Sequence, residues 1–280
     1  MSGRIAEVHR SGLTFDVLDE GPIEGDVVVL LHGFPERATC WRSVAPLLHE
    51  RGFRTLAMDQ RGYAPRARPP RRRDYRLTEL SDDVAALVTA AGAGAPVHVV
   101  GHDWGAIVAW ALALRQPELV RTLTAVSVPH PTAFLRSMLS SDQVLRSWYM
   151  LLFQLPWVPE LSARRRGSVF DRSLAHAGMR PEEVARCRAE VIEAGALTGG
   201  MNWYRALPFL DRTLIGKHVT VPTTLLWSDG DVALGRKGAE LTERYVDGPY
   251  RFVALRGVSH WIPTQEPEAC AEAILDRIGA

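Results

Sequence analysis

Along the chain, short unbroken runs of apolar residues alternate with longer stretches in which apolar residues recur every three or four positions. The runs predict strands buried on both faces, and the longer stretches predict amphipathic helices that pack on them. Ser11 and Gly12 separate two short segments and predict an N-terminal hairpin. Thr78 or Ser81 is the predicted N-cap of the helix over 77–91. The predicted strands are 6–10, 13–19, 27–31, 53–58, 96–100, 119–128, 221–227 and 251–255, and the predicted helices are 41–50, 77–91, 104–115, 236–245 and 267–278.

This rhythm breaks between residues 132 and 214, where the sequence is helix-like and rich in aromatic residues. Strands alternating with helices predict a mostly parallel, doubly wound α/β sheet, so the break predicts a helical cap inserted after about the sixth strand. The predicted core domain is therefore 1–131 and 215–280, and the predicted cap domain is 132–214. Ligands of open α/β sheets bind beyond the carboxyl ends of the strands, which places the cap over the expected site.

Composition narrows the class of protein. A chain of 280 residues with 46% hydrophobic residues and a formal net charge of +1 is typical of a globular protein with no general attraction to nucleic acids or membranes. Two arginine-rich stretches, 66–73 and 164–166, are interpreted as solvated surface. The cysteines at 40, 187 and 270 are scattered, which favours reduced thiols over disulfides or a metal cluster. Without a signal peptide or a run of membrane-spanning length, the expected location is the cytoplasm.

The candidate chemistry begins at residues 101–105, Gly-His-Asp-Trp-Gly, between a predicted strand and a predicted helix. A small residue on each side of a central nucleophile is the form of a nucleophile elbow, in which a bulkier side chain would collide with the strand or the helix. The central residue is Asp103, whose carboxylate can attack carbon and form an ester. The alternative interpretation is that Asp103 merely caps the helix.

An ester on a carboxylate needs a base that helps water to remove it. His260 follows the last predicted strand, which is the position of the base in an α/β-hydrolase, and nucleophile, acid, histidine is the order of that fold. The acid should follow the preceding strand, where Asp229 and Asp231 are both candidates. A carboxylate there would orient the imidazole and stabilise its protonated form.

Taken together, these segments resemble the epoxide hydrolase family of the α/β-hydrolase superfamily, in its soluble microbial type, over essentially the whole chain. Residues 32–35, His-Gly-Phe-Pro, match the oxyanion-hole loop of that family, which implies that the backbone N–H groups of Phe34 and Trp104 form the hole. In that family the acid stands four positions after the tryptophan of the strand. This spacing selects Asp231 over Asp229.

The cap carries two further matches to the family. Tyr149 begins a Tyr-x-x-x-Phe-Gln-x-Pro segment, and Tyr204 lies in Asn-Trp-Tyr-Arg. In the family both tyrosines open the epoxide ring, because two phenol O–H donors can stabilise and protonate the alkoxide that develops. For a single aromatic residue in a cap, packing is the competing interpretation.

The resemblance implies an enzyme that adds water to an apolar epoxide and releases a vicinal diol through an ester on Asp103. Tyr149 and Tyr204 would grip the ring oxygen, and His260 with Asp231 would activate the water. No metal, organic cofactor or nucleic-acid partner is expected, and the chain is expected to be a monomer or homodimer. The aromatic residues expected to bind substrate are Phe34, Trp104, Trp148, Phe153 and Trp203.

Three other functions share part of this pattern. A haloalkane dehalogenase shares the ester chemistry but tends to have Asn where this chain has Phe34, and it lacks the paired phenols. A fluoroacetate dehalogenase usually has Arg where this chain has Trp104. From another class, the chain would be a catalytically silent binding protein on the same scaffold.

Overall fold

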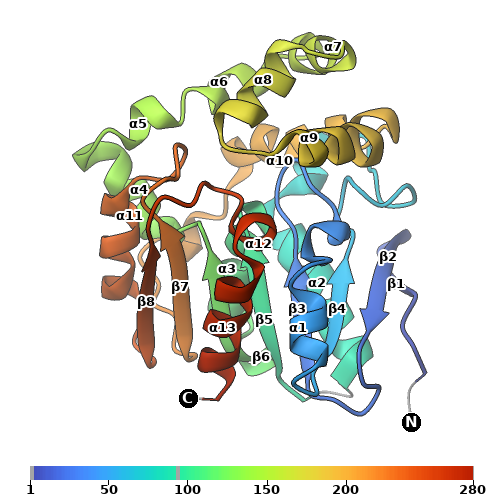
Figure 1. Ribbon diagram of the computed structural model, residues 1–280, viewed down its shortest axis with the longest axis vertical. Coiled ribbons are helices and arrows are strands. Elements are labelled where there is room, and N and C mark those ends of the chain that lie inside the picture. The colour runs from blue at the N-terminus through green and yellow to red at the C-terminus, as the bar shows by residue number, and fades with distance from the viewer. Residues whose placement is uncertain (1–2, 93–94, 280) are drawn as a thin grey trace.

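The computed structural model describes residues 3–92 and 95–279 and has an eight-stranded sheet at its centre (Figure 1). The strand order is β1-β2-β4-β3-β5-β6-β7-β8. Neighbouring strands from β4 to β8 are parallel, while β1 and β2 form an antiparallel hairpin at one edge. The strands are β1 (Glu7–Arg10), β2 (Leu13–Glu20), β3 (Val27–Leu31), β4 (Arg54–Met58), β5 (Val97–His102), β6 (Val120–Val126), β7 (Thr223–Ser228) and β8 (Tyr250–Leu255). The predicted α/β sheet is confirmed.

Helices cover both faces of this sheet, which explains why its central strands read as unbroken apolar runs. In β3, Val28 and Leu30 pack in one cluster with α1 and α13, while Val29 and Leu31 pack in the opposite cluster with α2 and α3. The helical elements of the core are η1 (Ala38–Trp41), α1 (Ala45–His49), η2 (Arg72–Tyr75), α2 (Leu77–Gly92), α3 (Trp104–Arg115), η3 (Pro117–Leu119), α11 (Arg236–Leu241), η7 (Thr242–Tyr245), α12 (Ile262–Gln265) and α13 (Pro267–Ile278).

Two details of the predicted helices are wrong. The helix expected over 41–50 is shorter, because Pro46 has no N–H to donate and therefore stands in the first turn of α1. The expected N-caps of α2 are also wrong, since this helix begins at Leu77 and includes both residues. Ser81 donates its hydroxyl to the backbone carbonyl oxygen of Thr78 at 3.1 Å, so its side chain bonds within the helix.

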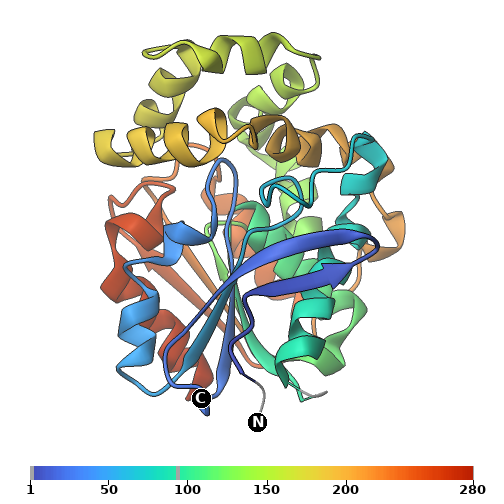
Figure 2. The ribbon, with the colours of Figure 1, turned by 90° about the vertical axis from the view of Figure 1, so that its right-hand side faces the viewer.

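The described residues between β6 and β7 contain helical elements above the carboxyl ends of the strands (Figures 1 and 2). Ala133 of the first of them, α4, packs on Leu241 and Tyr245 beside the sheet, so α4 adjoins the core. The division into domains at 131–132 and 214–215 stays a prediction. The elements are α4 (Pro131–Ser140), α5 (Gln143–Arg146), α6 (Tyr149–Phe153), α7 (Val158–Arg164), α8 (Val169–His176), α9 (Pro181–Cys187), the π-helix η4 (Arg188–Glu193), α10 (Leu197–Arg205), η5 (Leu207–Phe209) and η6 (Arg212–Leu214).

Within the described parts of the chain, every helix is too short or too polar to cross a membrane.

Candidate active site

The turn between β5 and α3 displays Asp103 above the sheet. Asp103 has φ 51° and ψ −122°, a backbone conformation that residues other than glycine rarely adopt. A Cβ at Gly101 would lie 2.2 Å from the carbonyl oxygen of Gly105, and a Cβ at Gly105 would lie 2.1 Å from that of Leu31. The elbow therefore needs both glycines. Within the described residues of α3, the Asp103 side chain makes no capping hydrogen bond, so the capping interpretation is wrong.

The loop after β3 reaches Asp103 directly. A Cβ at Gly33 would lie 2.3 Å from the Cβ of Asp103, so only glycine permits this approach. The next residue, Phe34, donates its backbone N–H to Asp103 Oδ1 at 2.7 Å. Trp104 follows Asp103 as the first residue of α3. One carboxylate oxygen is thus held by the predicted oxyanion-hole loop, and the other is left to face the cavity.

His260 stands between two carboxylates. Its Nδ1 lies 2.7 Å from Asp231 Oδ2, and its Nε2 lies 3.4 Å from Asp103 Oδ2. Asp231 is held in turn by the backbone N–H groups of Ala233 and Leu234, at 2.7 and 2.9 Å from its Oδ1.

Asp229, the other candidate acid, has a different partner. Its Oδ1 accepts the backbone N–H of Gly257 at 2.6 Å in the turn after β8. The structure therefore brings Asp231, and not Asp229, to the imidazole of His260.

The charges of these groups are coupled. Burial acts to lower the pKa of His260, but the negative charges of Asp231 and Asp103 outweigh it and raise this pKa to about 10. Burial acts to raise the pKa of Asp103, but the hydrogen bond and charge of His260 and the Phe34 N–H outweigh it and lower this pKa. At neutral pH the resting site therefore holds an ionised Asp103 carboxylate beside a protonated imidazole.

Two phenols from the cap share the cavity with Asp103 and His260. Tyr149 on α6 and Tyr204 on α10 have ring centroids 6.0 Å apart. Burial first, and then the negative charge of Asp103, raise the pKa of both phenols, so both keep their protons as donors.

Residues that follow the two tyrosines in sequence hold their helices together. Gln154, at the end of α6, donates its side-chain amide to the carbonyl oxygen of Tyr204 at 2.8 Å. Arg205 donates to the carbonyl oxygens of Phe153 and Leu155 at 2.9 and 2.7 Å and pairs with Glu160 at 2.6 Å. The distance between α6 and α10 is thus set by buried polar contacts.

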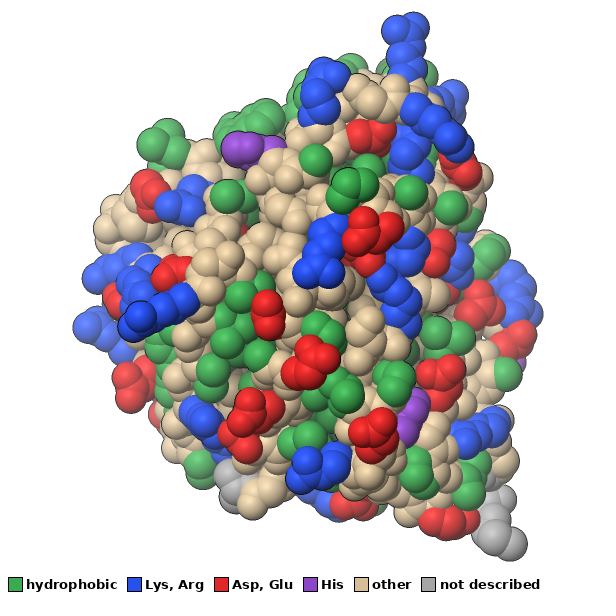
Figure 3. Space-filling view, in the orientation of Figure 1, with side chains coloured by type: hydrophobic (Ala, Val, Ile, Leu, Met, Phe, Trp, Pro, Cys, Tyr) green, Lys and Arg blue, Asp and Glu red, His purple; other side chains and the backbone are tan. Residues whose placement is uncertain are grey.

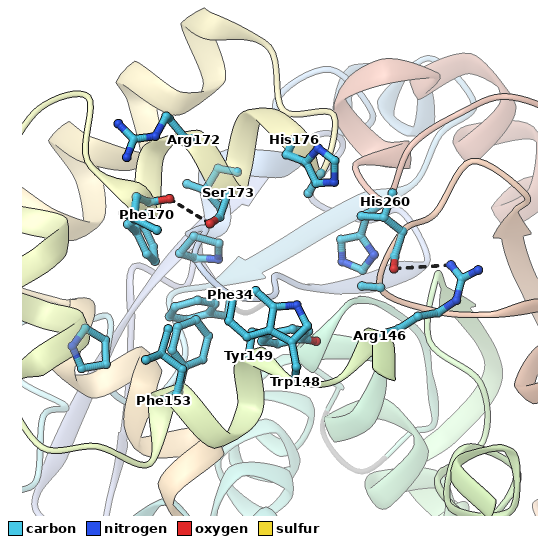
Figure 4. Close-up of a pocket in the computed structure, with 18 of the residues that line it drawn as sticks. Phe34, Arg146, Trp148, Tyr149, Phe153, Phe170, Arg172, Ser173, His176 and His260 are labelled. Carbon is cyan, nitrogen blue, oxygen red and sulfur yellow. Dashed lines mark hydrogen bonds between the residues drawn. The ribbon is translucent and has the colours of Figure 1, made fainter. Parts of the chain in front are cut away.

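The cavity above Asp103 has a volume of about 850 Å³ and a mostly apolar wall (Figure 4). Phe34, Trp148 and Phe153 line it as expected. The expectation was wrong for Trp104 and Trp203, because neither is among the described residues that line the cavity. Trp203 donates its indole N–H to the Arg61 carbonyl at 2.8 Å behind the cavity, and Trp104 packs edge-on against Tyr204 with ring centroids 5.0 Å apart.

Comparisons with known proteins agree with this geometry. The model of the α/β hydrolase fold family matches residues 26–266. AB hydrolase superfamily protein YfhM of Bacillus subtilis is 36% identical, over 96% of this chain and 96% of the relative. Epoxide hydrolase 2 of Caenorhabditis elegans is 33% identical over 93% of this chain and 76% of its own length. The crystal structure of epoxide hydrolase A from Mycobacterium thermoresistibile superposes with a TM-score of 0.81 at 30% identity, covering 98% of this chain and 97% of that one.

The chain belongs to the epoxide hydrolase family of the α/β-hydrolase superfamily. The resemblance and the fold expected from the sequence are confirmed.

The structure of this epoxide hydrolase family member also contains a buried chain of polar groups beneath His260, which was not predicted from the sequence. His102 donates its Nε2–H to the carbonyl oxygen of His260 at 2.9 Å, and its Nδ1 faces Glu36 Oε2 at 3.5 Å. Arg186 of α9 completes the chain at 2.8 Å from Glu36. Burial opposes ionisation of Glu36, but His102 and Arg186 lower its pKa to about 2. The sequence signal was adjacency, since Glu36 directly follows residues 32–35 and His102 directly precedes Asp103.

Proposed function

We propose that the protein hydrolyses an apolar epoxide to a vicinal diol through a covalent ester on Asp103. The observation that carries this proposal is the pair of protonated phenols, Tyr149 and Tyr204, in one buried cavity with an ionised carboxylate nucleophile. The names of the relatives, which include epoxide hydrolases, point to the same reaction.

In the first step, Asp103 Oδ2 attacks a ring carbon while the Phe34 N–H keeps Oδ1 in place. The carbon–oxygen bond of the ring breaks, and the negative charge that leaves Asp103 appears on the ring oxygen. Tyr149 and Tyr204 donate to that oxygen, and one of them transfers its proton. The product of this step is a hydroxyalkyl ester of Asp103.

The second step needs a base, which the first step itself generates. Because ester formation removes the charge of Asp103, one of the two causes of the raised pKa of His260 disappears. The imidazolium proton passes through water to the tyrosinate that the first step leaves. The neutral imidazole then takes a proton from a second water as the oxygen of that water attacks the Asp103 carboxyl carbon. The oxyanion develops on Oδ1, where the N–H of Phe34 already donates and that of Trp104 is adjacent. Asp231 stabilises the imidazolium, which protonates the departing diol oxygen.

Diol formation and halide release distinguish the leading function from its nearest rival. The purified protein is expected to convert apolar aliphatic or aryl epoxides to diols, and to release no halide from haloalkanes or haloacids of similar size. The physical reason is that two phenol donors match one developing alkoxide. Gas chromatography and a halide electrode measure the two activities. Halide release without diol formation would contradict the proposal and favour a dehalogenase, while loss of neither activity in Asp103→Ala would contradict Asp103 as the nucleophile.

The two candidate acids give a matched pair of variants. Asp231→Asn is expected to lower the pKa of His260 well below about 10, because a negative charge 2.7 Å from Nδ1 is lost. Ester hydrolysis should slow by roughly 10³- to 10⁴-fold, since the imidazolium loses its partner. Asp229→Asn, whose carboxylate binds the Gly257 N–H, should change neither. NMR titration of the imidazole and single-turnover kinetics measure the two effects, and the reverse outcome would assign the acid to Asp229.

A further inference from the structure

The outer surface of the cap is apolar where a surface helix is normally polar. On α7, Pro159 and Ala163 are buried against the cap. Trp157 and Leu161, one turn apart on the opposite face, are 74% and 57% exposed. The larger apolar side chains of this segment therefore face outward, where the side chains of a surface helix are usually polar.

The same character continues over the neighbouring cap helices. Leu151 of α6 is 76% exposed, and further exposed apolar side chains lie near it in sequence or on α5 and α8. Several of these exposed side chains also line the cavity, so the apolar surface is continuous with the cavity wall. We call this set the cap apolar surface: Leu145, Trp148, Leu151, Trp157, Val158, Leu161 and Val169.

Arginines border this surface. Arg164 and Arg165 end α7, and Arg172 on α8 lies at the cavity beside Ser173 (Figure 4). Among the residues that the structure describes, none of the three forms an ion pair. Figure 3 shows hydrophobic and arginine side chains next to one another along the upper edge of the molecule, where Figure 1 places the cap.

The nearby carboxylates do not neutralise these arginines, because other partners occupy them. Glu160 pairs with Arg205 at 2.6 Å, and Asp171 pairs with Arg188 at 2.8 Å, both inside the cap. The exposed edge of the cap thus combines an apolar patch with excess positive charge.

We propose that the cap apolar surface docks on an anionic lipid bilayer. Exposed Trp and Leu side chains enter the boundary between headgroups and acyl chains, and the bordering arginines pair with lipid phosphates. A second copy of this chain fits less well, because a symmetric contact would bring the unpaired Arg164, Arg165 and Arg172 of both copies together.

Docking would turn the exposed part of the cavity wall toward the bilayer. Leu145, Trp148, Val158 and Val169 belong both to the cap apolar surface and to the cavity wall. An apolar epoxide dissolved in the lipid could then reach Asp103 along a continuous apolar path. This delivery rests on the proposed function, whereas the docking itself does not.

Vesicle binding in the absence of substrate tests the docking. The protein is expected to sediment with vesicles of phosphatidylcholine and phosphatidylglycerol, more strongly at low salt, and far less with phosphatidylcholine alone. Replacing Arg164 and Arg165 by Gln should weaken partitioning roughly 25-fold, from a factor of about five for each charge. Trp157→Ser with Leu161→Ser should weaken it at least about tenfold.

Matched controls come from the core. Leu18→Ser with Ile23→Ser removes apolar side chains that are 44% and 38% exposed, and replacing the exposed Arg71 and Arg72 by Gln removes the same charge as the cap variant. Both controls should bind as the wild type does. Equal binding to both kinds of vesicle, equal losses in cap and core variants, or a dimer that the cap variants disperse without any vesicle binding would each overturn the proposal.

The delivery has its own readout. In the cap variants, turnover of an epoxide dissolved in anionic vesicles should fall with vesicle binding, while turnover of a water-soluble epoxide should stay unchanged. Loss of both activities would contradict delivery from the bilayer. Vesicle binding by a protein with no epoxide turnover would contradict the proposed function and leave the docking supported.

Discussion

His260→Gln is expected to stop the enzyme after one ester has formed, leaving an adduct one substrate mass heavier on a peptide that contains Asp103. Ester formation needs the carboxylate and the phenols, whereas ester hydrolysis needs a base, and no proton acceptor replaces the lost imidazole. Turnover should fall by roughly 10⁴-fold or more. Mass spectrometry of digested protein after brief exposure to substrate measures the adduct.

His218→Gln is the matched control, because His218 pairs with Asp247 at 2.8 Å and is outside the set of described residues that line the cavity. It should turn over normally and give no adduct. A wild-type single turnover in heavy-oxygen water completes the test, since the first diol should be mostly unlabelled and the label should enter Asp103. A fully labelled first diol, with no adduct in His260→Gln, would show that water attacks the epoxide directly.

Loss of the two phenols has the second large effect. Tyr149→Phe or Tyr204→Phe should slow ester formation by roughly 10- to 1,000-fold, because one donor to the developing alkoxide is lost. In the double variant ester formation should nearly stop, since the alkoxide would then develop beside an apolar wall with no phenol to donate a proton. Stopped-flow measurement of ester formation isolates this step from hydrolysis.

Tyr63→Phe controls for removal of a buried hydroxyl. Tyr63 packs against Trp203 with ring centroids 5.2 Å apart and is outside the set of described residues that line the cavity. Its loss should leave ester formation unchanged, and circular dichroism should show all these variants folded. Wild-type rates in the double variant would contradict the assignment of the phenols and reopen dehalogenation.

Local sequence was sufficient to predict most of the sheet and the sharp turn at Asp103. Strand β3 was predicted to the residue because both of its faces are buried, which leaves an unbroken apolar run with sharp ends. The elbow at Asp103 was predictable because the flanking glycines answer steric demands made by adjacent residues.

Contacts between distant segments could not be predicted in this way. Glu36, His102 and Arg186 come from a loop, a strand and a cap helix, and only folding brings them under His260. Trp203 reads like a pocket residue, but its position on α10 points its N–H at Arg61 behind the cavity. Nor did the periodicity of α7 show that its apolar face would be turned outward.

The contacts of Gln154 and Arg205 between α6 and α10 suggest a way to recognise other sequences that can open an epoxide ring. Gln154 ends the helix that Tyr149 begins, and Arg205 directly follows Tyr204, yet each side chain contacts the other tyrosine's helix. A chain that keeps the two tyrosines but replaces Gln154 and Arg205 would retain the phenols while losing control of the gap between them. Screening new sequences for all four positions, instead of tyrosines alone, should therefore separate competent ring-opening sites from caps in which the aromatic residues are only filling space.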